Sequence, residues 1–415
     1  MKILYISDYF QPYASGASNI STYLMVKKLS ETNNCYVITQ KFKEEPWVYR
    51  GLSVYPLLPR YSAGKSIKDL LKVEILVFLK LQNIFEFYRV IHNFCKLKEI
   101  EVVNVESNNL MLLVALLFLH KPVVIDVRDY YLVCPFMLKT KHCSKHHLFC
   151  TPSGIENRQG LFVDILRFIF FRYKSFVYYF VKNIILKPLL NIRHTKYVFV
   201  ANSNYVRKTL IKEFKNKINT QVIYNTINAD DYSRKAVKKR VVLFASSLEE
   251  AKGVWNCIYT FEKFKSDILF EVVGDGPEMT SIAHYIKRRK IRNIKLLGKL
   301  EYKYMPPLYE KAYITVQPSV WPEPFGRYIL ESFASKTPLI TTATGGTPEA
   351  IKDGETGLLI PANNQQELTK AMTKLLTNKK LYKHIQGNIT SEAKKYHPDL
   401  IVKQRVALYN ELVAI

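Results

Sequence analysis

The stretch VQPSVWPEPFGRYILESFASKTPLITTATGGTPEAIKDGETGLLIP, residues 316–361, alternates short apolar runs of strand length with a helical segment. Pro318 ends a buried strand, a loop follows, and Pro324 stands where a helix is expected to start, since proline suits the first helical position. TPLITTA and GLLIP indicate further strands. A strand, a loop, a helix and a strand in this order predict a βαβ unit with a parallel sheet.

The same alternation extends through the chain in two series. KILYIS, CYVIT, SVYPL, VVNVES and PVVIDV indicate strands of a first series, and a second begins at about residue 220 with TQVIY. The polar segment 224–240 lacks periodicity and is expected to connect them. We therefore predict an α/β chain of two Rossmann-like, doubly wound domains, 1–222 and 223–397. They would face each other across a cleft, with ligands at the carboxyl ends of both sheets.

The charge balance is strongly basic. The 415 residues hold 61 Lys and Arg against 35 Asp and Glu, a net charge of +26 that favours polyanionic partners. Nucleic acid is not expected, because helix-turn-helix, zinc-finger and RNA-recognition patterns are missing from the sequence. The first residues do not resemble a signal peptide and no apolar run is long enough to span a membrane. A cytoplasmic location with reduced cysteines is expected.

Part of the charge excess is regional. Residues 151–222 carry 13 basic side chains against 3 acidic ones. Within them, 161–197 mixes aromatic residues with Arg167, Arg172, Lys174, Lys182 and Lys187. One interpretation is an amphipathic helix lying on the inner face of an anionic membrane. The other is a core helix whose long basic side chains are solvated.

Residues 316–361 also predict a ligand site. The backbone amides of Phe325, Gly326 and Arg327 would be unpaired donors at a helix start, suited to a phosphate or sugar oxygen. Gly326 would let a ligand approach the backbone closely. Glu323 lies in the preceding loop and Glu331 about two turns into the helix. One carboxylate could face a sugar ring and the other could accept hydrogen bonds from vicinal hydroxyls.

Several motifs together resemble a known family. EPFGRYILE is an E-x7-E element, followed by GGTPE (345–349) and DGETGLL (353–359). Upstream lie VVGDGPE (272–278), LLGKL (296–300), the Lys252-Gly253 pair and VIYNTIN (222–228). This set resembles the nucleotide-sugar domain of retaining glycosyltransferases of family 4, which have the GT-B fold. The resemblance also implies that residues 398–415 form a terminal helix that crosses back onto the first, acceptor-binding domain.

The resemblance implies a role for each matching position. Glu323 would contact donor-sugar hydroxyls, Glu331 would bind the ribose, and Lys252 would neutralise the diphosphate. The backbone of residues 325–327 would line the phosphate and sugar pocket. Gly16 would form the turn near the diphosphate, although an ordinary strand-to-helix turn is the alternative. Further donor-side positions are Gly274, which a plain turn would also explain, and Lys299, near the backbone expected to meet the nucleobase.

Two departures from the family pattern affect this assignment. Ser247 stands where the family usually has an arginine, so one phosphate cation is missing, and Arg327 or another basic residue would have to replace it. Arg128 and Asp129 stand where the family often has a His-Asp pair. We expect both in the catalytic set, with Arg128 contacting the donor sugar or phosphate. A salt-bridged structural Arg128 is the alternative.

A cysteine- and histidine-containing segment follows Asp129. Cys134, Cys143 and Cys150 with His146 could furnish a tetrahedral zinc site, although their spacing differs from the usual paired ligands. A local disulfide and free thiols in an acceptor-side loop are the alternatives.

The resemblance implies retaining transfer of a hexose-type sugar from a UDP- or GDP-sugar to a glycan or lipid-linked acceptor at a membrane. No cofactor is expected, and no catalytic metal, because the Asp230-Asp231 pair lies in the connecting segment. Two alternatives remain: a nucleotide-sugar epimerase on the same fold, and a catalytically silent glycan-binding protein.

Overall fold

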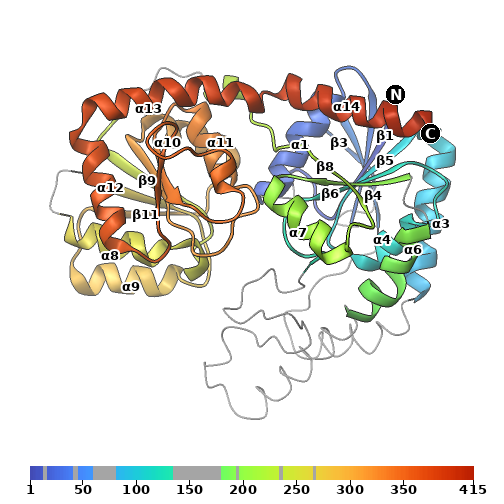
Figure 1. Ribbon diagram of the computed structural model, residues 1–415, viewed down its shortest axis with the longest axis horizontal. Coiled ribbons are helices and arrows are strands. Elements are labelled where there is room, and N and C mark those ends of the chain that lie inside the picture. Colours follow the sequence, from blue (N-terminus) through green and yellow to red (C-terminus); the bar gives the residue numbers. More distant parts are fainter. Residues whose placement is uncertain are drawn as a thin grey trace, which may run out of the picture. The chain divides into compact units, whose positions relative to one another are not determined.

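The computed structural model describes residues 1–12, 16–40, 45–58, 81–133, 179–192, 196–232, 237–264 and 268–415. These residues form two compact units (Figure 1). The first unit comprises Met1–Asn202, Val206–Ile223 and Val402–Ile415, and the second comprises Ser203–Tyr205 and Tyr224–Ile401.

The first unit is built on one sheet, whose described strands run in the order β3-β4-β2-β1-β5-β6-β7-β8. Only β3 pairs antiparallel, with β4, and the other described pairs are parallel. The strand order reverses between β1 and β5, which places the switch point of a doubly wound sheet there. The bounds are β1 (Lys2–Ser7), β2 (Asn34–Gln40), β3 (Trp47–Tyr49), β4 (Leu52–Leu58), β5 (Val102–Glu106), β6 (Val123–Val127), β7 (Tyr197–Ala201) and β8 (Asn219–Val222).

Helices cover this sheet. The start of α4 is fixed locally, because the Asn109 side chain accepts hydrogen bonds from the amides of Met111 and Leu112. The described helices are α1 (Ala17–Leu29), α3 (Leu81–Lys98), α4 (Leu110–Leu116), the π-helix η2 (Val181–Leu186), α6 (Lys187–Ile192), α7 (Asn204–Phe214) and α14 (Pro398–Ala414).

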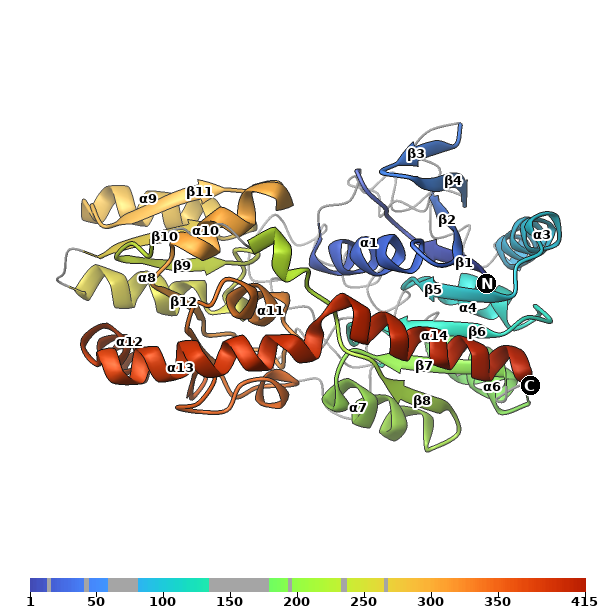
Figure 2. The ribbon, with the colours of Figure 1, turned by 90° about the horizontal axis from the view of Figure 1, so that it is seen from above.

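The terminal helix α14 is attached to the first sheet by buried polar contacts. Arg405 lies 2.7 Å from Asp126 of β6, and the Tyr409 hydroxyl donates to Asn104 of β5 at 2.8 Å. The hydroxyls of Tyr409 and Tyr5 are also 2.8 Å apart. Figure 2 shows α14 lying along this sheet. Residues 402–415 therefore belong to the first unit's core, although they end the chain.

The second unit has an entirely parallel sheet in the described residues, ordered β11-β10-β9-β12-β13-β14. Counted from β9, this is the 3-2-1-4-5-6 order of a dinucleotide-binding sheet, with its switch point between β9 and β12. The bounds are β9 (Val241–Ala245), β10 (Leu269–Val273), β11 (Ile294–Gly298), β12 (Ile314–Gln317), β13 (Leu339–Thr342) and β14 (Leu358–Ile360).

Helices pack on both faces of this second sheet, and α9 and α13 lie on opposite sides of it (Figures 1 and 2). Stacked rings of Phe261 and Phe270, 4.0 Å apart, join α8 to β10 in the core. The α-helices are α8 (Val254–Lys263), α9 (Met279–Arg289), α10 (Met305–Lys311), α11 (Arg327–Ala334), α12 (Gln365–Thr377) and α13 (Lys379–Glu392). Short 3-10 helices are η4 (Ala229–Tyr232), η5 (Glu250–Lys252), η6 (Tyr302–Tyr304), η7 (Thr347–Glu349) and η8 (Ala393–Tyr396).

Three sequence expectations are corrected by these elements. The helix expected at Pro324 begins at Arg327, because Gly326 is still extended, with φ −67° and ψ 126°. The TQVIY run does not open the second sheet, because β8 pairs with β7 of the first. The segment 224–240 is not simply a polar connection, since Ile227 and Tyr232 are buried in the second unit's core.

The basic stretch 161–197 is described only from residue 179 to 192 and from residue 196. Lys182 is fully buried, and its ammonium lies 2.8 Å from Glu213. Lys187 contacts the same carboxylate at 2.9 Å. The two ammonium groups share this one carboxylate. Lys182 does not face lipid headgroups as expected, because its side chain is buried, whereas the Lys187 side chain is still 24% exposed. Arg167, Arg172 and Lys174 lie outside the described residues. Among the helices that are described, none is both long and apolar enough to cross a membrane.

Candidate functional site

The loop after β12 and the short helix after β9 meet at the switch point of the second sheet. The Lys252 ammonium, from η5, lies 2.9 and 3.1 Å from the two carboxylate oxygens of Glu323. The Ser319 hydroxyl donates to the same carboxylate at 2.6 Å. Glu323 is only 4% exposed, so this carboxylate sits in a buried, charge-assisted cluster. The structure thus brings together Lys252 and Glu323, both expected from the sequence to bind the donor.

The backbone fixes Lys252 in this position. Gly253 has φ +74°, and a β-carbon there would fall 2.0 Å from the Pro318 carbonyl oxygen, so only glycine fits. The Gln317 side chain donates to the Lys252 carbonyl at 3.1 Å. The Lys252 ammonium also lies 4.4 Å from the centre of the Trp321 ring, a cation–π contact.

The GGTPE segment fixes Glu323 from the other side. The Gly346 amide donates to the Glu323 carbonyl at 2.7 Å. Gly345 has φ +62°, and a β-carbon there would lie 2.1 Å from the same carbonyl oxygen. Two consecutive glycines therefore allow this loop to pack directly on the backbone that carries the carboxylate.

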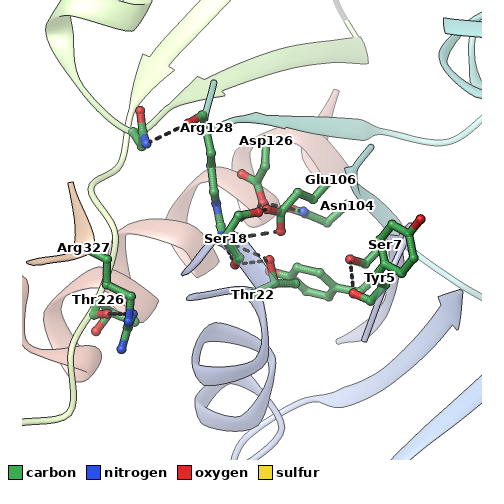
Figure 3. Close-up of polar contacts among 12 residues, drawn as sticks. Tyr5, Ser7, Ser18, Thr22, Asn104, Glu106, Asp126, Arg128, Thr226 and Arg327 are labelled. Atoms are coloured by element: carbon green, nitrogen blue, oxygen red, sulfur yellow. Dashed lines mark hydrogen bonds and ion pairs between the residues drawn. The ribbon is translucent and has the colours of Figure 1, made fainter. Parts of the chain in front are cut away.

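A second charged pair lies in α11. Arg327 Nε donates to Glu331 at 3.1 Å, and the Arg327 guanidinium also donates to the Tyr302 hydroxyl at 2.8 Å. The guanidinium also donates to the Thr226 carbonyl at 3.4 Å (Figure 3). Burial raises the pKa of Glu331 above its ordinary value, against the attraction of Arg327. These contacts favour a structural role for the Arg327 side chain over the expected replacement of the missing phosphate cation.

The segment from Phe325 to Arg327 offers mainly backbone to a ligand. The Phe325 ring packs against Tyr224 and Tyr396 at centroid distances of 5.1 and 5.6 Å, and so belongs to the core. Gly326 caps α11, and a β-carbon there would collide with the Tyr328 ring at 2.1 Å. The side chains of this segment are thus used in packing. The backbone at the start of α11 is what remains to contact a ligand.

The remaining donor-side positions of the second unit lie at the same edge of the sheet. Ser247 follows β9, Gly274 follows β10, and the exposed Lys299 follows β11. Gly274 has φ +139°, and a β-carbon there would lie 1.8 Å from the Ser246 carbonyl oxygen. The loops after β9 and β10 are therefore in backbone contact, and glycine is required for that contact.

In the first unit, Arg128 follows β6 and is held by neighbouring groups (Figure 3). Its guanidinium donates to the Ser18 carbonyl and the Thr22 hydroxyl, both at 2.9 Å. It also lies 3.3 Å from Glu106 and 3.7 Å from Asp126, with 8% of the side chain exposed. This arrangement is the salt-bridged alternative that the sequence left open.

Glu106 is a buried carboxyl at the end of β5. Burial raises its pKa from 4.5 to about 7, although Arg128 and a hydrogen bond from Ser18 act in the opposite direction. One of its oxygens has no hydrogen-bond partner among the described residues. The group therefore titrates near neutral pH inside the fold.

Asp129 and Gly16 lie near this edge of the first sheet. The Asp129 carboxylate accepts from the Tyr131 amide at 2.9 Å and from the Asn108 side chain at 3.0 Å, and burial raises its pKa. The backbone amide of Asn108 also donates to the Asp8 carboxylate at 3.3 Å. Gly16 caps α1 with φ −78°, an ordinary conformation, so the tight-turn role expected for it is not required by the backbone.

The cysteine- and histidine-containing segment with Cys134, Cys143, Cys150 and His146 lies outside the described residues. Within the parts of the chain that are described, no group of three His, Cys, Asp or Glu side chains is placed to hold a metal ion. The described cysteines Cys35, Cys95 and Cys257 are free thiols.

Several residues of the site were not identified from the sequence. Ser319 and Trp321 complete the surroundings of Lys252 and Glu323, and Asp8 and Asn108 join Asp129 at the switch point of the first sheet. A signal was available for Ser319, Asp8 and Asn108. Polar side chains directly after a buried strand, next to the reversal of strand order, are the positions that a doubly wound sheet offers to a ligand.

Comparison with known proteins identifies part of the chain. Residues 226–392 match the family model described as glycosyl transferases group 1. This segment is a group 1 glycosyltransferase domain. An uncharacterized glycosyltransferase of Methanocaldococcus jannaschii is 29% identical over 219 residues, which cover 51% of this chain and 59% of that protein. The chain spans about half the length of the curated relatives that it matches. The group 1 domain contains Lys252, Glu323 and the GGTPE loop.

Solved structures show the fold. Sucrose-phosphate synthase from Thermosynechococcus elongatus has a TM-score of 0.73 at 15% identity, covering 100% of this chain and 99% of that one. Anabaena HepE in complex with UDP has a TM-score of 0.67 at 17% identity, covering 99% of this chain and 100% of that one. The chain has the GT-B fold of two Rossmann-like domains, as the sequence predicted.

Proposed function

We propose that this protein is a retaining glycosyltransferase of family 4 that moves a hexose-type sugar from a UDP- or GDP-sugar to a membrane-associated glycan or lipid-linked acceptor. The pathway would be the synthesis of a surface polysaccharide or glycoconjugate. The second unit would bind the donor and the first the acceptor. The observation that carries the proposal is the buried Lys252–Glu323 pair at the switch point of the group 1 domain.

The chemistry of this pair suits a nucleotide-sugar donor. Breaking the bond between the sugar and the diphosphate leaves negative charge on the phosphate oxygens, and a fixed cation stabilises that charge. Lys252 would supply this cation, together with backbone amides before α11. No bound metal is needed for the same neutralisation, so we propose a metal-independent reaction.

Glu323 would position the sugar. In the structure its carboxylate is occupied by Lys252 and Ser319. When the donor binds, Lys252 would turn one or more of its donors toward the diphosphate, and the freed carboxylate oxygen would accept hydrogen bonds from sugar hydroxyls. Glu331 would bind the ribose through the oxygen that does not face Arg327.

Two findings support the donor class and the acceptor side. HepE, which shares the fold, has been solved with UDP and with UDP-glucose. The first unit exposes several large apolar side chains, among them Phe85 at 67%, Leu97 at 75% and Phe118 at 43%. Such side chains suit contact with the acyl boundary of a membrane, where a lipid-linked acceptor is found. Peripheral association with the inner face of the membrane is part of the proposal.

A donor and product assay tests the proposal. The full chain is incubated with a panel of UDP- and GDP-hexoses, with and without a membrane extract as acceptor, in the presence and absence of EDTA. We expect release of nucleoside diphosphate from one nucleotide class, EDTA resistance, and a product anomer that matches the donor in NMR. An inverted product would contradict retention, and conversion of the donor sugar without acceptor would indicate an epimerase instead.

A further inference from the structure

The first unit contains a pocket away from the residues described above. It lies between the carboxyl-terminal part of α3 and the turn before β6, and has a volume of about 360 Å³. Its inner wall is apolar, because Cys95 and Leu119 are 3% and 2% exposed. Burial raises the pKa of the Cys95 thiol to about 12, so the thiol adds no negative charge at neutral pH.

The remaining lining is mostly basic. Lys96 and His92 come from α3, and His120 and Lys121 come from the turn before β6. In the described part of the chain, neither lysine has a carboxylate within ion-pair distance. Lysines near a helix carboxyl terminus are favoured by the helix dipole alone, which would account for Lys96. Lys121 belongs to a different segment, so the dipole of α3 does not explain why the Lys96 and Lys121 side chains line the same pocket.

A single carboxylate, that of Glu99, lines the pocket. Its charge is compensated, since Glu99 is hydrogen-bonded and ion-paired with Lys2, and that contact lowers the Glu99 pKa. The pocket therefore presents two uncompensated ammonium groups and two imidazoles over an apolar floor. Cations above an apolar wall attract an anion more strongly than the same cations in open solvent.

The pocket is separated from Glu106 and Arg128, at the switch-point edge of the first sheet, by the length of the strands. Glu99 and Lys121 precede β5 and β6, whereas Glu106 and Arg128 lie at the other ends of these strands. Five residues of parallel strand span roughly 16 Å. A ligand at the carboxyl ends of the sheet cannot fill this pocket.

We propose that this pocket is a binding site for a phosphate group, carried by a phosphate monoester or diester. Two sources share this chemistry: the headgroup of an anionic lipid, and a free phosphate compound. Leu97 and Phe118, next to Lys96 and His120 in the chain, are 75% and 43% exposed and could contact acyl chains. The site stands independently of the proposed glycosyl transfer.

The test uses the full-length protein and two matched double variants. Lys96→Gln with Lys121→Gln removes the two ammonium groups of the pocket and keeps most of each alkyl chain. Lys208→Gln with Lys212→Gln removes the same charge from two exposed lysines of α7 in the same unit. Circular dichroism and thermal unfolding confirm that each variant folds. Binding of inorganic phosphate and glycerol 3-phosphate is measured by calorimetry, and binding of phosphatidylcholine vesicles with and without phosphatidylglycerol by sedimentation.

We expect saturable binding of glycerol 3-phosphate by the wild-type chain, at least about tenfold weaker in the pocket variant and changed less than about twofold in the α7 variant. A parallel loss of vesicle binding in the pocket variant alone would identify a lipid headgroup as the source. Unchanged vesicle binding would identify a free phosphate compound. No saturable binding by the wild-type chain, or equal losses in both variants, would overturn the proposal.

Discussion

Lys252 and Glu323, 71 residues apart in the chain, form an ion pair at the switch point of the second sheet, in which the ammonium contacts both carboxylate oxygens. The lysine side chain is 17% exposed and the glutamate side chain 5%. The same unit contains a second pair of similar geometry, Lys311 with Glu271 at 2.8 Å, with side chains 27% and 5% exposed. The two pairs differ in location, because Glu271 lies within β10 rather than in a loop after a strand. Each substitution at the first pair therefore has a matched control at the second.

Replacing Glu323 by Gln should lower sugar transfer at least about a hundredfold, because a neutral amide cannot orient sugar hydroxyls and balance Lys252 together. Glu271→Gln neutralises an equally buried glutamate, and its turnover should stay within about threefold of wild type. The measurement is nucleoside diphosphate release at saturating donor. Equal turnover in the two variants would show that Glu323 has no special role.

Substituting Gly345 by Ala should both destabilise the second unit and weaken donor binding. Gly345 and Gly354 both have positive φ, +62° and +74°. Of the two, only a β-carbon at Gly345 would collide with other atoms, the nearest being the Glu323 carbonyl oxygen at 2.1 Å. Gly354→Ala carries only the backbone cost of about 1–2 kcal/mol. Gly345→Ala should cost about 2 kcal/mol more in the free energy of unfolding. Chemical denaturation checks this, and equal losses would contradict the collision.

Removing the Arg405 charge should loosen the terminal helix. In Arg405→Met the Asp126 carboxylate, 1% exposed, loses the cation at 2.7 Å. It keeps a hydrogen bond from Asn104 at 2.8 Å and the Arg128 guanidinium at 3.7 Å. Loss of one partner of a buried pair costs about 3–5 kcal/mol. Hydrogen exchange of residues 402–415 should therefore accelerate, whereas Lys403→Met, at an exposed position of the same helix, should leave it unchanged. Unchanged protection in both variants would show that α14 is held by apolar packing alone.

The stability of the first unit should fall as the pH rises from about 4.5 to 7. The pKa of Glu106 is raised in the fold from 4.5 to about 7, so the folded protein binds this proton more tightly than the unfolded chain. The resulting stabilisation is complete below pH 4.5 and is lost between pH 4.5 and 7, with a slope of at most about 1.4 kcal/mol per pH unit.

Denaturation curves between pH 5 and 8 check this dependence. Glu106→Gln should make it shallower, because the Glu106 carboxyl is gone, and Asp129, whose pKa is also raised by burial, continues to titrate. Glu213→Gln is the control. Burial alone would raise the pKa of Glu213, but Lys182 and Lys187 outweigh it, so the pKa is lowered. The contribution of Glu213 to the free energy of unfolding therefore changes only at acid pH. If Glu106→Gln retains the wild-type slope, the titration belongs to another group.

Local sequence patterns predicted the two mainly parallel sheets and the edge where the site forms. Strand and helix periods and glycine positions are properties of short segments. Lys252 and Glu323 were found in this way. Their partners depend on distant parts of the chain: Arg405 binds a residue 279 positions away, and Lys182 binds Glu213 from another helix. For the same reason, the composition of the basic stretch shows the charges of Lys182 and Lys187 but not their shared contact with Glu213. The expectation that α11 starts at Pro324 was wrong, because Gly326 is still extended and the helix begins at Arg327.

Calorimetric titration of UDP and GDP into the wild-type chain, Lys252→Met and Lys311→Met tests the central claim most directly. Both variants break an ion pair with a buried glutamate, so both should lose similar stability. Only Lys252→Met should lose affinity for the preferred nucleoside diphosphate, by at least about thirtyfold, whereas Lys311→Met should bind it within about twofold of wild type. Wild-type affinity in Lys252→Met, or equal losses in both variants, would contradict the assignment of this ion pair to the donor diphosphate.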